Sequence, residues 1–93
     1  MTLQASIEIS MYPLQEQYCQ PILDFIASLE QYDDIRIEKN AMSTQIFGDY
    51  RILMAALTED IERVLQQNPK TIFILKLLGT DRSKADIERC GDH

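Results

Sequence analysis

Uncharged hydrogen-bonding side chains gather in two short stretches of the sequence and are the groups best suited to hold a small molecule. The first stretch contains Ser10 and Tyr12, and the second contains Asn40, Ser43, Thr44 and Gln45. Hydroxyl and carboxamide groups donate and accept hydrogen bonds without adding charge, as the polar rim of a small-ligand pocket requires. Met11, Met42 and Phe47 lie in the same stretches and would supply apolar walls. The alternative is that the polar residues lie on a sheet surface and in a hairpin and bond only to water or backbone.

A catalytic centre is not indicated by the residue types. The only histidine, His93, is the last residue of the sequence, so a serine or cysteine nucleophile lacks a plausible base. Cys19 and Cys90 do not have the spacing of a zinc site or a disulfide framework, and we expect two reduced thiols. The carboxylate pairs Asp33–Asp34 and Glu59–Asp60 are expected to be solvated charges in a turn and on an exposed helix face. We therefore predict no catalytic residue, metal or cofactor.

Size and charge restrict the partners. A chain of 93 residues with 45% hydrophobic content is long enough for one domain with one core. The net charge is −6 and the nine Lys and Arg residues are scattered, which argues against nucleic acid and anionic membranes as partners and favours a small neutral or cationic ligand. No signal peptide or membrane span is indicated. We predict a soluble cytoplasmic protein with one ligand-binding domain over residues 1–79 and a flexible tail over residues 80–93, which contains at most a short helical turn.

The first half of the chain begins with a strand and a helix. Residues 4–12 alternate between apolar and polar side chains, as in a strand with one buried face, and Pro13 should end that strand. Residues 16–32 follow helical spacing, with Tyr18 in the apolar stripe. Pro21 is compatible with this helix only in its first turn.

A hairpin and a second helix are predicted next. The alternation restarts at residues 35–37, and the short distance to Phe47 leaves no room for a crossover helix, so we expect a hairpin that turns within residues 40–43. Gly48 and Asp49 would close the second strand of this hairpin, with Asp49 as the N-cap of a helix. A lone glycine of this kind is no phosphate loop; it marks a strand-to-helix turn or a close approach of a ligand to the backbone.

The last predicted strand differs from the first. The second helix should stop at Asn68, which precedes Pro69, and residues 71–78 form a strand that is apolar on both faces. Such a strand belongs inside a sheet or at an interface. The element order is strand, helix, strand, strand, helix, strand, which predicts an α+β, ferredoxin-like β-α-β-β-α-β sandwich with a four-stranded antiparallel sheet and two helices on one face. The bare sheet face would carry Glu8, Ser10 and Tyr12, and it favours a homodimer through the sheets or along a strand edge.

Three short runs also resemble a known family. Residues 9–14 (ISMYPL), 40–50 (NAMSTQIFGDY) and 54–57 (MAAL) are similar to the YkoF-like thiamine and hydroxymethylpyrimidine-binding family, and the similarity extends over residues 7–78. The resemblance implies a ferredoxin-like domain that dimerises and binds the pyrimidine part of thiamine without turning it over. The family motifs fall on Ser10, Tyr12, Pro13, Ser43, Thr44, Gly48 and Asp49. YkoF itself resembles two such domains in tandem, so a site that needs two domains would here require two copies of the chain.

The resemblance agrees with the residue types. Tyr12 and Phe47 could stack on a cationic or flat heterocycle, while Ser10, Asn40 or Thr44 could meet ring nitrogens and an exocyclic amine. We therefore expect a homodimer or tetramer that binds thiamine or its hydroxymethylpyrimidine moiety in uptake or salvage. A second hypothesis is an ACT-like oligomerisation or regulatory module that binds no thiamine. An acylphosphatase-like enzyme is the weakest alternative, because residues 14–17 provide no arginine for a phosphate loop.

Overall fold

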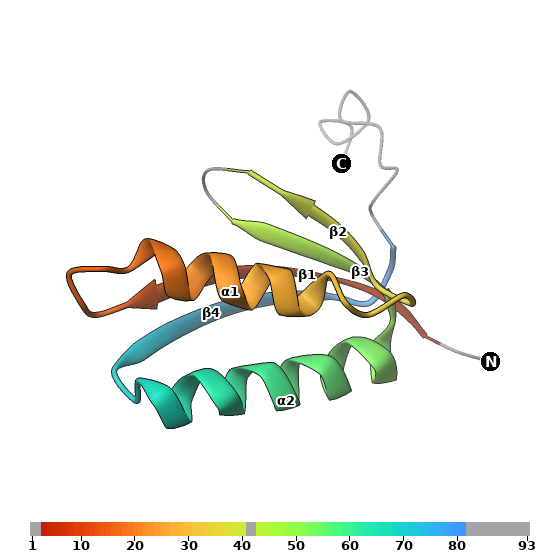
Figure 1. Cartoon of the computed structure of the whole chain (residues 1–93). Coiled ribbons are helices and arrows are strands. Elements are labelled where there is room, and N and C mark those ends of the chain that lie inside the picture. The colour runs from red at the N-terminus through yellow and green to blue at the C-terminus, as the bar shows by residue number, and fades with distance from the viewer. Residues whose placement is uncertain (1–2, 41–42, 82–93) are drawn as a thin grey trace.

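The chain folds into two layers. A computed structural model describes residues 3–40 and 43–81. Its elements are β1 (Gln4–Pro13), α1 (Cys19–Leu29), β2 (Arg36–Lys39), β3 (Thr44–Asp49), α2 (Tyr50–Gln67) and β4 (Thr71–Leu78). The strands form one antiparallel sheet in the order β2-β3-β1-β4, and both helices lie on the same face of it (Figure 1). This is the ferredoxin-like α+β fold that the element order predicts.

Helix α1 is shorter than predicted. It begins at Cys19, so Pro21 lies in the first turn, as expected. An earlier start at Glu16 would have placed this proline where its missing N–H breaks a helical hydrogen bond. Tyr18 therefore precedes the helix and is 54% exposed, and its expected place in the apolar stripe was wrong.

Helix α2 begins and ends where the sequence predicts. The Asp49 side chain accepts a hydrogen bond from the backbone N–H of Ile52 at 3.2 Å, which satisfies one of the free N–H groups of the first turn. The helix ends at Gln67, just before Asn68 and Pro69. The described ends of the hairpin also agree with the prediction, because β2 stops before residue 40 and β3 starts after residue 43.

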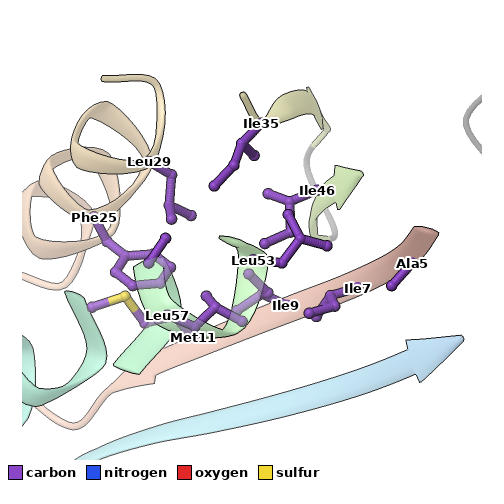
Figure 2. Close-up of a cluster of buried hydrophobic side chains, with 11 residues drawn as sticks. Ala5, Ile7, Ile9, Met11, Phe25, Leu29, Ile35, Ile46, Leu53 and Leu57 are labelled. Carbon is purple, nitrogen blue, oxygen red and sulfur yellow. The ribbon is translucent and has the colours of Figure 1, made fainter. Parts of the chain in front are cut away.

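The core lies between the sheet and the helices. Alternate residues of β1 point toward the helices, as its pattern predicts, and α1 and α2 each contribute one stripe (Figure 2). The buried apolar residues of this cluster are Ala5, Ile7, Ile9, Met11, Phe25, Leu29, Ile35, Ile46, Leu53, Ala56 and Leu57. Phe73 of β4 packs beneath them, with its ring centre 5.3 Å from that of Phe25.

Asp60 departs from the prediction. It was expected on an exposed helix face, yet it is 1% exposed because its spacing from Ala56 and Leu57 places it on the buried face of α2. The Tyr32 hydroxyl donates to its Oδ1 at 3.3 Å, and the Arg63 guanidinium contacts the same oxygen at 3.0 Å. Partial burial and the neighbouring Asp60 carboxylate raise the pKa of Tyr32.

The open face of the sheet carries the polar side of β1. In the register of β1 with β4, Ser10 lies opposite Ile74 and Tyr12 lies opposite Ile72, so this isoleucine pair shares the open face while Phe73 faces the core. β4 has only β1 as a neighbour and is an edge strand. Of the two places predicted for a strand apolar on both faces, a position inside the sheet is therefore excluded.

The chain after β4 lies against the opposite end of the open face. The Ser6 hydroxyl donates to the backbone carbonyl of Thr80 at 2.6 Å, and Arg36 forms a salt bridge with Asp81. Phe47 pairs with both Ser6 and Arg36 on the neighbouring strands and is only 3% exposed, although its side chain belongs to this open face. The rest of the predicted flexible tail, residues 82–93, lies outside the described residues, as do Cys90 and His93.

Candidate functional site

A cavity of about 390 Å³ opens where β1 extends beyond β3. Within the described residues the pairing of these two strands ends at Ile9 and Thr44, whereas β1 continues to Pro13 alongside β4. The start of α1 and the β2–β3 hairpin close the space beside the overhanging part of β1. Among the described residues, no β3 residue pairs with β1 beyond Ile9, and Ser10 to Leu14 line the cavity on this side.

Five of the eight predicted site residues line this cavity. They are Ser10, Tyr12, Asn40, Ser43 and Thr44. Apolar side chains complete the lining: Ile9, Met11, Pro13, Leu14, Tyr18, Ile22, Phe25 and Ile26. None of these side chains carries a formal charge, so the cavity suits a flat, largely uncharged molecule that forms a few hydrogen bonds.

The hairpin residues are held in place by hydrogen bonds. The backbone N–H of Asn40 donates to the carbonyl of Ser43 at 3.1 Å, and the backbone N–H of Ser43 donates to Oδ1 of Asn40 at 3.1 Å. The Ser43 hydroxyl donates to Oε2 of Glu8 on β1 at 3.2 Å, and Lys76 lies 3.5 Å from the other oxygen of that carboxylate. The rim is therefore positioned before any ligand arrives. Met42, the predicted apolar wall, lies outside the described residues.

The lining residues lie at different depths in the cavity. Thr44 is 7% exposed and lies opposite Ile9, so its hydroxyl group belongs to the inner part of the site. Tyr12 is 49% exposed, and the ring of Tyr18 is similarly accessible, so both lie at the mouth. Two aromatic rings at the entrance could contact the faces of a heterocycle while the inner hydroxyl groups bond to its edge.

Phe47, Gly48 and Asp49 lie elsewhere. They occupy the opposite end of β3 from Thr44, about 10–17 Å away at the rise of an extended strand. Asp49 caps α2, and Phe47 lies on the open face of the sheet. Gly48 has φ +155°, and a Cβ atom there would lie 2.9 Å from the carbonyl oxygen of Asp34. Each of the three has a structural role at this end of β3. None of them lines the cavity with the other five predicted site residues.

Sequence reasoning missed Tyr18 and the α1 residues Ile22 and Ile26 as parts of the cavity. Their helical spacing is that of ordinary core residues, and periodicity does not distinguish a wall that faces a cavity from one that faces a strand. A signal did exist in the strand lengths. β1 was predicted to be much longer than the third strand, and a long strand beside a short one leaves part of an edge unpaired.

Two other kinds of function find no support in the part of the chain that the structure describes. Residues 3–40 and 43–81 contain no group of three His, Cys, Asp or Glu side chains that could hold a metal ion. No described helix combines the length and the apolar character that a membrane span requires.

No protein-family model and no curated protein matches the chain, but solved structures do. Protein SP2199 from Streptococcus pneumoniae has a TM-score of 0.77 and 20% identity, covering 98% of this chain and 100% of that one. A hypothetical protein from Methanocaldococcus jannascii has a TM-score of 0.73 and 25% identity, covering 96% and 93%. A candidate thiamine biosynthesis/salvage protein from Thermotoga maritima has a TM-score of 0.74 and 15% identity, covering 96% of both chains. At these identities the likeness shows the fold, over nearly the whole length of each chain.

Proposed function

We propose that this protein binds thiamine, or its hydroxymethylpyrimidine moiety, in the cavity beside β1 without turning it over, as a cytoplasmic homodimer in uptake or salvage. The observation that carries the proposal is the convergence of Ser10, Tyr12, Asn40, Ser43 and Thr44 around one uncharged cavity. The sequence runs that resemble the YkoF-like family contain all five. The fold shared with the Thermotoga protein, which is itself a candidate for thiamine biosynthesis or salvage, supports the same conclusion.

The pyrimidine half of thiamine is the better match to the cavity. An aminopyrimidine is flat and neutral at pH 7, with ring nitrogens that accept hydrogen bonds and an exocyclic amine that donates them. Hydroxyl groups such as that of Thr44 can serve either function. The cationic thiazolium ring finds no carboxylate among the lining side chains. A volume of about 390 Å³ is also near the lower end for small-molecule pockets, which extend from roughly 300 to 1,000 Å³.

Isothermal titration calorimetry with hydroxymethylpyrimidine and with thiamine tests the proposal. Thr44→Val keeps the shape of the side chain but removes the inner hydroxyl group, and we expect affinity to fall about three- to tenfold. Tyr12→Ala removes a ring at the mouth and should weaken binding at least as much, whereas Tyr12→Phe separates loss of the ring from loss of its hydroxyl group.

Thr80→Val is the matched control. It makes the same substitution at an exposed position outside the cavity and should leave affinity unchanged. Equal affinities for Thr44→Val, Tyr12→Ala and the control would show that the ligand binds outside this cavity. Absence of binding by the folded wild-type protein to either compound would refute the proposed function.

The second candidate is an ACT-like interaction module. The exposed apolar side chains of β4 favour it, because such side chains on an edge strand suit contact with another chain. If the protein forms oligomers but binds neither thiamine nor hydroxymethylpyrimidine, that result would favour this alternative.

A further inference from the structure

The hydrogen-bond donors of Ser43 are all engaged within the protein. Its backbone N–H donates to Oδ1 of Asn40 at 3.1 Å, and its hydroxyl group donates to Oε2 of Glu8 at 3.2 Å. Its backbone carbonyl accepts from the N–H of Asn40 at 3.1 Å. A serine residue has two protons to donate, one on the backbone nitrogen and one on the hydroxyl oxygen, and both are used here. Ser43 can therefore offer a molecule in the cavity only lone pairs, which accept hydrogen bonds.

The direction of the hydroxyl proton follows from the chemistry of Glu8. A carboxylate has no proton to give, so the serine must be the donor in the bond between them. Lys76 lies opposite Glu8 in the register of β1 with β4, and its ammonium nitrogen is 3.5 Å from Oε1 of the same carboxylate. The two oxygens of Glu8 thus have different partners, and the carboxylate is held between the hairpin and β4.

Glu8 acts on the cavity from outside it. Glu8 lies opposite Gln45 of β3, so Ser43 is its diagonal neighbour, two residues along the same face. Ser43 lines the cavity, whereas Glu8 is not among the lining residues. A ligand would therefore meet the serine and not the carboxylate, and it would sense Glu8 through the direction of the hydroxyl bond.

We propose that Ser43 selects ligands that present a hydrogen-bond donor to it, and that in an aminopyrimidine this donor is the exocyclic amine. The inference rests on the proposed function and deepens it, because it states which chemical group is recognised by which residue. An amine N–H that points at the Ser43 oxygen forms a hydrogen bond. A carbonyl oxygen in the same place would meet only lone pairs and would lose its hydrogen bonds to water without replacement. Ser43 is then a specificity-determining residue, and Glu8 is the positioning residue that acts through it.

The charge of Glu8 strengthens the same preference. Hydrogen bonds in a chain polarise one another, so a hydroxyl group that donates to a carboxylate becomes a better acceptor for a further donor. A hydroxyl group without such a partner rotates, and it can donate or accept as the ligand requires. Removing the charge of Glu8 should therefore reduce the discrimination between donor and acceptor ligands more than it reduces binding itself.

The test compares two ligands that differ at one group. Hydroxymethylpyrimidine carries the exocyclic amine, and its oxo analogue carries an oxygen atom in place of that amine. Isothermal titration calorimetry on the full chain should show that the wild type binds the amino compound about ten- to a hundredfold more tightly. The ratio of the two affinities is the quantity that each variant should change.

Glu8→Gln keeps the shape of the side chain but replaces the carboxylate with a group that can also donate. Ser43 can then either donate or accept, so the affinity for the oxo compound should rise about three- to tenfold while that for the amino compound stays nearly constant. A general disturbance of the hairpin would instead weaken both ligands. Ser43→Ala removes the hydroxyl group and should also lower the ratio, with a loss of affinity for the amino compound.

Glu38→Gln is the matched control. Glu38 lies opposite Gln45 from the other side, so the same charge is removed from the same row of the open face, at an exposed position outside the cavity. This variant should keep the wild-type ratio, and circular dichroism should show that all three variants are folded.

The outcomes separate the inference from the proposed function. Equal affinities of the wild type for the two compounds, or tighter binding of the oxo compound, would overturn the inference and leave ligand binding standing. A ratio that stays constant in both Glu8→Gln and Ser43→Ala would overturn it as well, because another group would then contact the amine. A wild-type protein that binds neither compound would refute the proposed function and the inference together.

Discussion

Gly48→Ala should destabilise the fold strongly without any direct effect on the cavity. Gly48 has φ +155°, a backbone conformation that side chains rarely adopt, and that conformation costs about 1–3 kcal/mol for a residue other than glycine. The new Cβ would also lie 2.9 Å from the backbone carbonyl oxygen of Asp34, and a main-chain atom in a tight turn moves only at further cost of about 1 kcal/mol. We therefore expect a loss of about 3 kcal/mol in the free energy of unfolding.

Urea unfolding followed by circular dichroism measures this loss directly. For a domain of this size, about 3 kcal/mol corresponds to a fall in Tm of roughly 12–24 °C, so the variant should remain folded at low temperature. Gly79→Ala is the matched control, because its Cβ would meet nothing within 4 Å, and its stability should stay within about 0.5 kcal/mol of the wild type. Equal stabilities of the two variants would refute the strain argument. If folded Gly48→Ala lost ligand affinity while Thr44→Val kept it, the ligand would lie at the α2 end of β3.

Two further variants test the contacts that hold the helices. Asp49→Ala removes the cap of α2 and should lower the free energy of unfolding by about 1 kcal/mol, measured as a lower urea midpoint; an unchanged midpoint would contradict the capping role. Tyr32→Phe should protect against alkaline unfolding, because the folded protein raises the pKa of Tyr32 above its ordinary value of 10.0. The stability that comes from keeping this phenol neutral is complete below pH 10.0 and is lost as the pH rises through the higher folded pKa, a loss that phenylalanine cannot show. If the free energies of unfolding of the wild type and Tyr32→Phe fell in parallel above pH 10.0, ionisation of Tyr32 would not contribute to alkaline unfolding.

The fold was predictable because local signals agree with one another. Alternation in β1, the Asp49 cap, and Pro69 after α2 each identify one boundary, and the short hairpin leaves few topologies to choose from. The element order then leads to the ferredoxin-like sheet. The errors came where one residue has two competing signals. Pro21 shortened α1 from its N-terminal side, and Asp60 is a carboxylate whose charge predicts exposure while its position on the helix dictates burial.

The candidate site was predictable only in part. Polar residue types identified Ser10, Tyr12 and the hairpin group. Phe47 was added as an apolar wall, and Gly48 and Asp49 were added from the family resemblance, and all three are neighbours of Thr44 in sequence. A strand separates such neighbours by about 3.3 Å per residue, so the two ends of β3 face different surroundings. Pattern alone cannot say which end meets a cavity, since that depends on where the partner strand stops.

The location of the cavity follows from unequal strand lengths. β1 pairs with β4 from Ser6 to Pro13, so β1 can continue past the end of β3 and still have a hydrogen-bonded neighbour in the sheet. That overhang needs β4 to be firmly placed, yet β4 is an edge strand that makes its sheet contacts on one side only. The positions of Ser10 and Tyr12 therefore depend on the pairing of β1 with β4 as well as on the residues that line the cavity.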